Sequence, residues 1–137
     1  MRGVIHHIDL TVRDLAVSRP FYDAVLGFMG YRCTRAQADG IDWDRDGPCL
    51  FCSIGIKPAR RDVPHDRYTP GLHHLAWAAE SRADVDRLHA ELLRIGARIL
   101  DAPADYPQYG AGYYAVFFAD PDGLKLEYVC VPGQTSG

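Results

Sequence analysis

An internal repeat divides the 137-residue chain into two similar halves. The repeat begins at His6 and His7 with HHIDLTVRDLAVSRPFYDAVL and returns 67 positions later, at His73 and His74, as HHLAWAAESRADVDRLHAELL. Apolar positions coincide along the two copies. Repetition of one unit at a fixed spacing indicates a fold built from two copies of the same supersecondary structure.

Each copy starts with an alternating apolar run, continues with a helical pattern and ends in three strand-like runs. In the first copy these three runs are 31–36, 40–46 and 49–56, and in the second they are 97–102, 113–120 and 124–131. The order is therefore β-α-β-β-β, twice, which predicts an α+β fold. We place module 1 at about 1–57, a linker rich in proline and charge at about 58–71, and module 2 at about 72–132.

The helix of the second copy has clear ends. Ser81 is a natural N-cap, Asp84 follows three residues later as in a capping box, and Gly96 is a typical C-terminal stop. We expect this helix to pack on the sheet through the apolar stripe that lies between Ser81 and Gly96.

The helix of the first copy is harder to place, because Pro20 would disrupt a helix that began before it. Asp14 or Ser18 is the candidate N-cap. We predict a late start near Ser18, or a distorted first turn, and an end at Gly27.

Composition excludes several classes of partner. The net charge is −3 and the chain is 47% hydrophobic, so it resembles an ordinary globular protein and gives no reason to expect nucleic acid or a membrane as partner. No apolar run is long enough to cross a bilayer, and the first residues lack a signal peptide, which makes a cytoplasmic location the expectation. Cys49 and Cys52 form a C-x-x-C pair without a second pair to complete a zinc site, so we expect the cysteines to be buried, reduced thiols.

Strand alternation assigns a face to each histidine. Ile8 and Leu10 share the face that packs on the helix, which leaves His7 on the opposite face. The second copy repeats the pattern and leaves His74 on the equivalent face. His6 and His73 fall on the apolar face or at the strand entry, where a buried neutral histidine with one hydrogen bond is the ordinary interpretation.

Glu127 lies in the middle of the last apolar run, after the turn sequence DPDG at 120–123. A carboxylate inside a buried strand is costly unless it is paired or binds a metal. His7, His74 and Glu127 therefore form a candidate metal site, with Zn, Fe, Ni or Mn as the divalent ions that such ligands suit. A salt bridge or an exposed edge position for Glu127 is the alternative.

Other residues are candidates for the lining of a substrate pocket. The segment 101–114 is rich in Pro, Gly and Tyr and is predicted to be a long loop that covers the metal-side cavity. A cation cluster in the linker would attract an anionic substrate unless it is simply solvated; its members are Lys57, Arg60, Arg61 and Arg67. The pocket candidates are Ser53, Phe51, Trp43, Tyr109, Tyr113 and Tyr114.

The chain resembles the vicinal oxygen chelate superfamily, which includes glyoxalase I, bleomycin-resistance proteins and extradiol dioxygenases. The resemblance is carried by 6–31, 71–97 and 113–129, and most specifically by the DPDG turn with Glu127. It implies a cupped, barrel-like mixed sheet with the helices outside, a divalent metal, a small substrate chelated through two oxygens, and a homodimer. The chain differs from glyoxalase I at the end of module 1. Those enzymes have a fourth metal ligand there, at the place that matches Glu127, whereas alignment of the two halves puts Ser53 at that place.

Two functions follow from the resemblance. The first is a metal-dependent enzyme, either a lyase or isomerase of the glyoxalase type or a ring-cleaving dioxygenase. The alternative is a metal-free protein that binds or sequesters a small molecule, as bleomycin-resistance proteins do. The presence of His7 and His74 favours the enzyme, because sequestering proteins usually lack these histidines.

Overall fold

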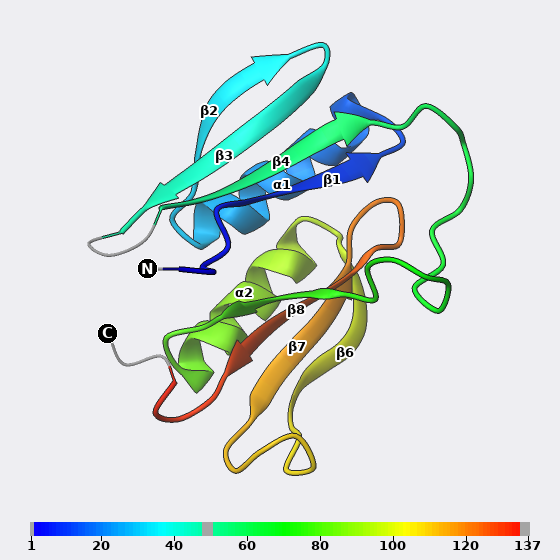
Figure 1. The fold of residues 1–137 in the computed structure, drawn as a ribbon. Helices are drawn as coiled ribbons and strands as arrows, with labels where there is room; N and C mark the ends of the chain where they lie inside the picture. The colour runs from blue at the N-terminus through cyan, green and yellow to red at the C-terminus, as the bar shows by residue number, and fades with distance from the viewer. Residues whose placement is uncertain (1, 48–50, 135–137) are drawn as a thin grey trace. The chain divides into compact units, whose positions relative to one another are not determined.

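The computed structural model describes residues 2–47 and 51–134 (Figure 1). The chain divides into two compact modules, Met1–Val63 and Pro64–Gly137. The division falls inside the segment expected to be a linker.

Module 1 is a four-stranded sheet with one helix, α1, packed on it (Figure 1). The strand order is β1-β4-β3-β2; β1 pairs with β4 in parallel and the remaining pairs are antiparallel. Apolar residues from one face of the sheet and from α1 form the core of the module. Its elements are β1 (His7–Val12), α1 (Leu15–Phe28), β2 (Arg32–Gln37), β3 (Gly40–Asp46) and β4 (Phe51–Pro58).

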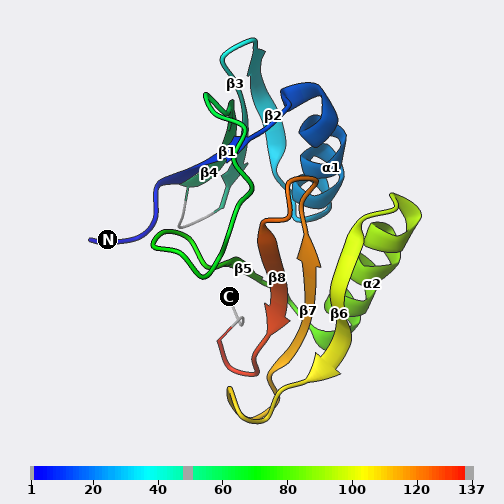
Figure 2. The same ribbon diagram turned by 90° about the vertical axis from the view of Figure 1, so that its right-hand side faces the viewer.

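Module 2 has the same topology, with strand order β5-β8-β7-β6 and α2 on one face of the sheet (Figure 2). Ser81 caps α2 by accepting a hydrogen bond from the Asp84 amide, and Gly96 follows the helix with φ +71°, as predicted. Its elements are β5 (Leu75–Ala78), α2 (Arg82–Arg94), β6 (Arg98–Asp105), β7 (Tyr114–Ala119) and β8 (Lys125–Cys130). The predicted α+β fold of two β-α-β-β-β modules is confirmed.

Of the two candidate N-caps of the first helix, the structure uses Asp14, so the late start near Ser18 is wrong and the end lies one residue beyond Gly27. The helix starts at Leu15, not near Ser18, because Asp14 accepts a hydrogen bond from the amide of Ala16 and caps it. Pro20 lies inside the helix, and the helix continues past Gly27 to Phe28. Burial of the apolar side of α1 against the sheet outweighs the one backbone hydrogen bond that Pro20 cannot donate.

The segment predicted as a long loop at 101–114 is shorter than expected. Strand β6 continues to Asp105 and contains two register shifts, at Ile99/Asp101 and at Asp101/Ala104. These irregularities and the edge position of β6 accommodate Pro103, which cannot donate a ladder hydrogen bond. The loop is therefore reduced to the turn at 106–113.

The cysteines do not share one environment. Cys130 is buried as predicted, Cys52 is half-buried and Cys33 is exposed, so the expectation of burial is wrong for Cys33. All three are free thiols, and Cys49 lies outside the described residues. Across the described parts of the chain, no helix combines the length and apolar character needed to cross a membrane.

Candidate functional site

Glu127 lies on the face of its sheet that is turned away from α2. Its neighbours in β8, Leu126 and Tyr128, are buried on the helix side, where the Tyr128 hydroxyl donates to Asp84 at 2.6 Å. Side chains alternate along a strand, so Glu127 points to the opposite face. Ala76 of β5 and Phe117 of β7 are its partners in register on the two neighbouring strands.

The Glu127 side chain is buried, with an exposed fraction of 2%, and both of its oxygens have partners. Oε1 lies 3.1 Å from Nε2 of His74, and Oε2 accepts a hydrogen bond from the Tyr113 hydroxyl. These contacts offset the cost of burying a carboxylate. Module 2 therefore brings together two of the three predicted metal ligands, His74 and Glu127.

His74 comes immediately before β5 and remains partly exposed, with 34% of its side-chain surface accessible. Its Nδ1 lies 2.7 Å from Nδ1 of His73. His73 is exposed, as is His6 in module 1, so the interpretation of these two residues as buried histidines is wrong. The pKa of His73 lies below its usual value, mainly through partial desolvation and then through the neighbouring His74, Lys125 and Arg67.

Aromatic residues of the turn at 106–113 lie beside Glu127. Tyr106 stacks on Tyr109 at 5.6 Å between ring centroids, and meets Tyr113 and Phe117 edge to face at 6.4 and 5.3 Å. The turn thus packs on the same sheet face as Glu127, away from α2. Desolvation, followed by the hydrogen bond to Glu127 and its charge, raises the pKa of Tyr113 well above the ordinary value, so its hydroxyl stays protonated and donates.

Module 1 contains the counterpart of this arrangement. His7 begins β1, is exposed, and pairs in register with Ser53 of β4. Its Nδ1 lies 3.0 Å from Nδ1 of His6. The strand register gives the place of Glu127 to Gly55, because Asp9 pairs with Gly55 as Ala76 pairs with Glu127; the alignment of Ser53 with Glu127 is therefore not the structural one. The acid beside His7 is Asp9, at 4.0 Å.

The pocket candidates fall into three groups. Ser53 shares the His7 face of module 1, and Tyr109 and Tyr113 belong to the aromatic turn of module 2. Trp43 is a core residue whose Nε1 donates to Asp23 of α1, and the hydroxyl of Tyr114 donates to Asp86 of α2. Both therefore belong to the helix side of their sheets rather than to the face that carries the histidines. The side chain of Phe51 lies outside the described part of the structure.

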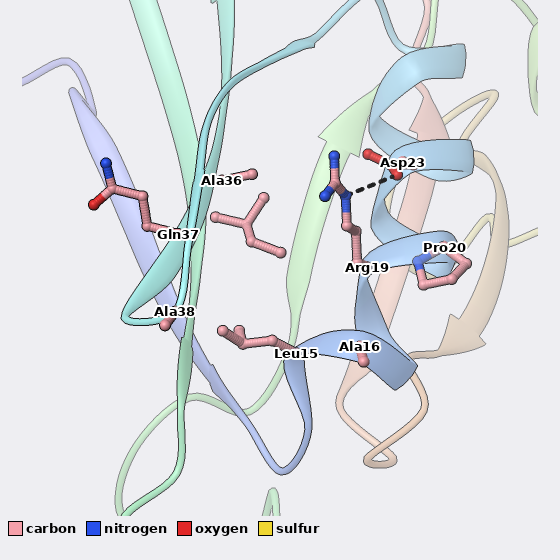
Figure 3. A pocket seen from close by; sticks show the side chains of 9 residues that line it. Leu15, Ala16, Arg19, Pro20, Asp23, Ala36, Gln37 and Ala38 are labelled. Atoms are coloured by element: carbon pink, nitrogen blue, oxygen red, sulfur yellow. Dashed lines mark ion pairs between the residues drawn. The ribbon is translucent and has the colours of Figure 1, made fainter.

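Two surface hollows lie in module 1. One, of about 660 Å³, separates α1 from β2 and β3 and contains the Arg19–Asp23 ion pair (Figure 3). The other, of about 730 Å³, is lined by Lys57, Arg60 and Arg61, three of the four cations considered for anion binding. The fourth, Arg67, lies over the ring of Tyr68. Neither hollow includes a predicted metal ligand.

Considered module by module, the described residues do not gather three His, Cys, Asp or Glu side chains into one potential metal site. His74 and Glu127 lie together in module 2, and His7 lies in module 1. The ligand set of all three residues thus stays a prediction.

Known proteins resemble the chain along almost its whole length. The family model for the Glyoxalase/Bleomycin resistance protein/Dioxygenase superfamily matches residues 4–128. The uncharacterized protein YqjT of Bacillus subtilis is 38% identical over 91% of this chain and 97% of its own length. The crystal structure of a glyoxalase-type protein from Bacillus halodurans has a TM-score of 0.76 at 31% identity, covering 95% of this chain and 97% of the other.

A larger enzyme carries a similar segment. The catechol-2,3-dioxygenase of Bacillus subtilis is 29% identical over 90% of this chain, which corresponds to 40% of the enzyme. Three observations point to the same family: the repeated topology, the placement of Glu127 and the match over residues 4–128. The chain belongs to the Glyoxalase/Bleomycin resistance protein/Dioxygenase superfamily.

Proposed function

We propose that this protein is a metal-dependent enzyme that acts on a small substrate with two neighbouring oxygen atoms, and that His7, His74 and Glu127 bind the metal. The observation that carries the proposal is the buried Glu127 carboxylate, held between His74 and Tyr113 on the face of the sheet opposite α2. Superfamily membership supports it, because dioxygenases are among the relatives.

The residues of module 2 fit a divalent metal. Imidazole nitrogen and carboxylate oxygen are ligands that Zn, Fe, Ni and Mn accept. Two such atoms bound to one ion at about 2.0–2.2 Å lie roughly 3 to 3.5 Å apart. His74 Nε2 and Glu127 Oε1 lie 3.1 Å apart, so little movement would be needed for both to reach one ion.

A bound metal would supply a Lewis acid that stabilises negative charge on a chelated substrate oxygen. The protein's own residues would hold the metal ligands in place and leave space for water or substrate beside them. Tyr113 fixes the orientation of Glu127 through its hydroxyl. Ser53, opposite His7 in the strand register, is a poor metal ligand, and Gly55, in the place that corresponds to Glu127, has no side chain to offer; both would leave coordination positions for water or for the two substrate oxygens. Isomerisation, lyase chemistry and ring cleavage are the reaction classes that this chemistry serves.

The test is metal analysis of protein purified without a histidine tag. We expect about one equivalent of metal per chain in the wild type, loss of that metal in His74→Ala, and retention in His65→Ala, which removes a histidine from the connecting segment instead. Both variants should keep the wild-type circular dichroism spectrum, because both side chains lie outside the core.

Two results would count against the proposal. Unchanged metal content in His74→Ala would show that the ligands are misassigned. A wild-type protein that takes up no metal from Zn, Fe, Ni or Mn solutions would favour the metal-free sequestering function.

A further inference from the structure

Each module places the imidazoles of two consecutive histidines in contact through the same pair of atoms. Nδ1 of His73 lies 2.7 Å from Nδ1 of His74, and Nδ1 of His6 lies 3.0 Å from Nδ1 of His7. The two rings are steeply inclined in both pairs, at 74° and 87°. The contact recurs in two separate modules, so it is a property of the repeated unit.

A contact between two Nδ1 atoms requires one ring to donate and the other to accept. A neutral imidazole has one N–H and one bare nitrogen, so the contact links the tautomers of the two rings. In module 2 the Glu127 carboxylate decides which of the two histidines donates the hydrogen bond. An ionised Glu127 accepts only, which places a proton on His74 Nε2 at 3.1 Å. His74 Nδ1 is then bare, and His73 must donate to it from its own Nδ1.

The first histidine of each pair is itself held in place. The ring of His73 meets Tyr68 edge to face at 5.6 Å between centroids. The carbonyl of His6 accepts a hydrogen bond from the amide of Ser53, which ties His6 to β4. Each therefore presents its Nδ1 to the second histidine from an anchored position.

From these contacts we infer that His73 and His6 are positioning residues, which orient the rings of His74 and His7 and give the Nδ1 of each a hydrogen-bond partner. The inference rests on the proposed function, in which His74 and His7 are metal ligands. A histidine that binds a metal through Nε2 carries its proton on Nδ1, and its Nδ1 then needs an acceptor. His73 provides that acceptor by placing its own proton on Nε2. His73 thus donates to His74 Nδ1 when no metal is bound and would accept from it when metal is bound. This pairing explains why a second histidine precedes His74.

The first experiment reads the tautomers in the metal-free protein. Nitrogen-15 NMR of labelled histidine distinguishes a protonated Nδ1 from a protonated Nε2. At a pH where the rings are neutral, we expect His73 with the proton on Nδ1 and His74 with the proton on Nε2, assigned by their loss in His73→Asn and His74→Asn. His65, in the connecting segment, is the control. A metal-free His73 that carries its proton on Nε2 would overturn the inference.

The second experiment measures affinity for Zn²⁺ by competition with a chelating dye. We expect His73→Ala and His6→Ala to weaken binding about 10- to 100-fold, as for other groups that hold a metal ligand in place. His73→Asn should recover part of the loss, because the Asn amide reaches the place of Nδ1, and His65→Ala should match the wild type. Binding by His73→Ala within twofold of the wild type would refute the positioning role while leaving the metal function intact.

The two experiments separate failure of the inference from failure of the proposed function. A wild type that binds no Zn²⁺ contradicts the proposed function, and the tautomers of His73 and His74 still decide whether the pair is linked as described.

Discussion

Gly96 and Gly112 have nearly the same φ angle in different surroundings. Their φ angles are +71° and +73°, a region that residues with a Cβ rarely enter. A Cβ on Gly96 would meet no atom within 4 Å, whereas one on Gly112 would lie 2.7 Å from Cγ of Pro132. Substitutions at these two glycines therefore distinguish the cost of backbone strain alone from the added cost of steric overlap.

We expect Gly96→Ala to lower the free energy of unfolding by about 1 kcal/mol, the cost of placing Ala in the left-handed region. Gly112→Ala should cost about 2–3 kcal/mol, because the methyl group also collides with the ring of Pro132. Urea unfolding followed by circular dichroism measures both. Equal losses would mean that Pro132 moves aside without cost.

The hydroxyl of Tyr113 is the donor that satisfies one oxygen of the buried Glu127. Tyr113→Phe leaves that oxygen without its partner, so we expect a loss of about 1–3 kcal/mol in unfolding free energy at pH 7. Tyr114→Phe is the matched control, because it removes a hydroxyl whose bond to Asp86 is exposed, and it should cost less than about 1 kcal/mol. A larger loss in Tyr114→Phe would contradict the importance assigned to the Glu127 contact.

The Tyr113 bond should also depend on pH in the alkaline range. The pKa of Tyr113 is raised in the folded protein, chiefly by desolvation and then by the Glu127 bond, above the value of 10.0 that an unperturbed tyrosine has. A raised pKa means that the protonated form is favoured in the folded state, so its contribution is complete below about pH 10 and is lost as the pH rises above it. The stability difference between wild type and Tyr113→Phe should therefore be constant from pH 7 to 9 and shrink above pH 10.

Sequence patterns predict some of the candidate site residues and not others. The alternation of β1 and β8 and the repeat single out His7, His74 and Glu127 because a strand has a fixed period. The Tyr113–Glu127 bond follows from the path of the turn at 106–113, which has no period. The exposure of His6 and His73 is missed because both residues lie before the strands, which begin at His7 and Leu75, where the alternation of faces no longer applies.

At the scale of elements, the two helices differ in how well local sequence defines them. α2 has Ser81 as cap, Asp84 in the first turn and Arg94 in the last, all of which favour a helix at that place. α1 has the Asp14 cap but neither an acidic first turn nor a basic last turn, and it contains Pro20. Local rules leave its start open between Asp14 and Ser18, because Pro20 opposes the earlier start, and the structure uses Asp14.

Replacement of Pro20 tests how much the missing backbone hydrogen bond destabilises α1. Pro20→Ala restores an N–H that can donate to the carbonyl of Ala16, so we expect the protein to become about 1–2 kcal/mol more stable, after allowance for the more flexible unfolded chain. Val17→Ala, at an exposed position of the same helix, is the control and should gain only about 0.5 kcal/mol from helix propensity. A Pro20→Ala protein no more stable than Val17→Ala would show that the proline is accommodated without cost.

At the scale of the whole molecule, the repeat predicts that both modules have the same order of elements, β-α-β-β-β. The strand orders β1-β4-β3-β2 and β5-β8-β7-β6 come from the structure, because the order of elements along the chain does not decide which strands pair. Oligomeric state is a property that such patterns do not encode, because it depends on which surfaces meet.

We propose a homodimer on the strength of the superfamily resemblance. Size-exclusion chromatography with light scattering should give twice the mass of the chain at micromolar concentration, and His74→Ala should elute with the wild type because its side chain is assigned to metal binding. A single-chain mass across the whole concentration range would contradict the proposal.

The unequal helices have a consequence for how the chain acquires its structure during synthesis. The ribosome releases module 1 first, and α1 is the helix less able to form from local interactions alone. We expect the local β2–β3 hairpin to form before α1 docks in module 1, and α2 to form early in module 2. We therefore expect the apolar side of β1 and β4 to stay exposed in the nascent chain until α1 docks.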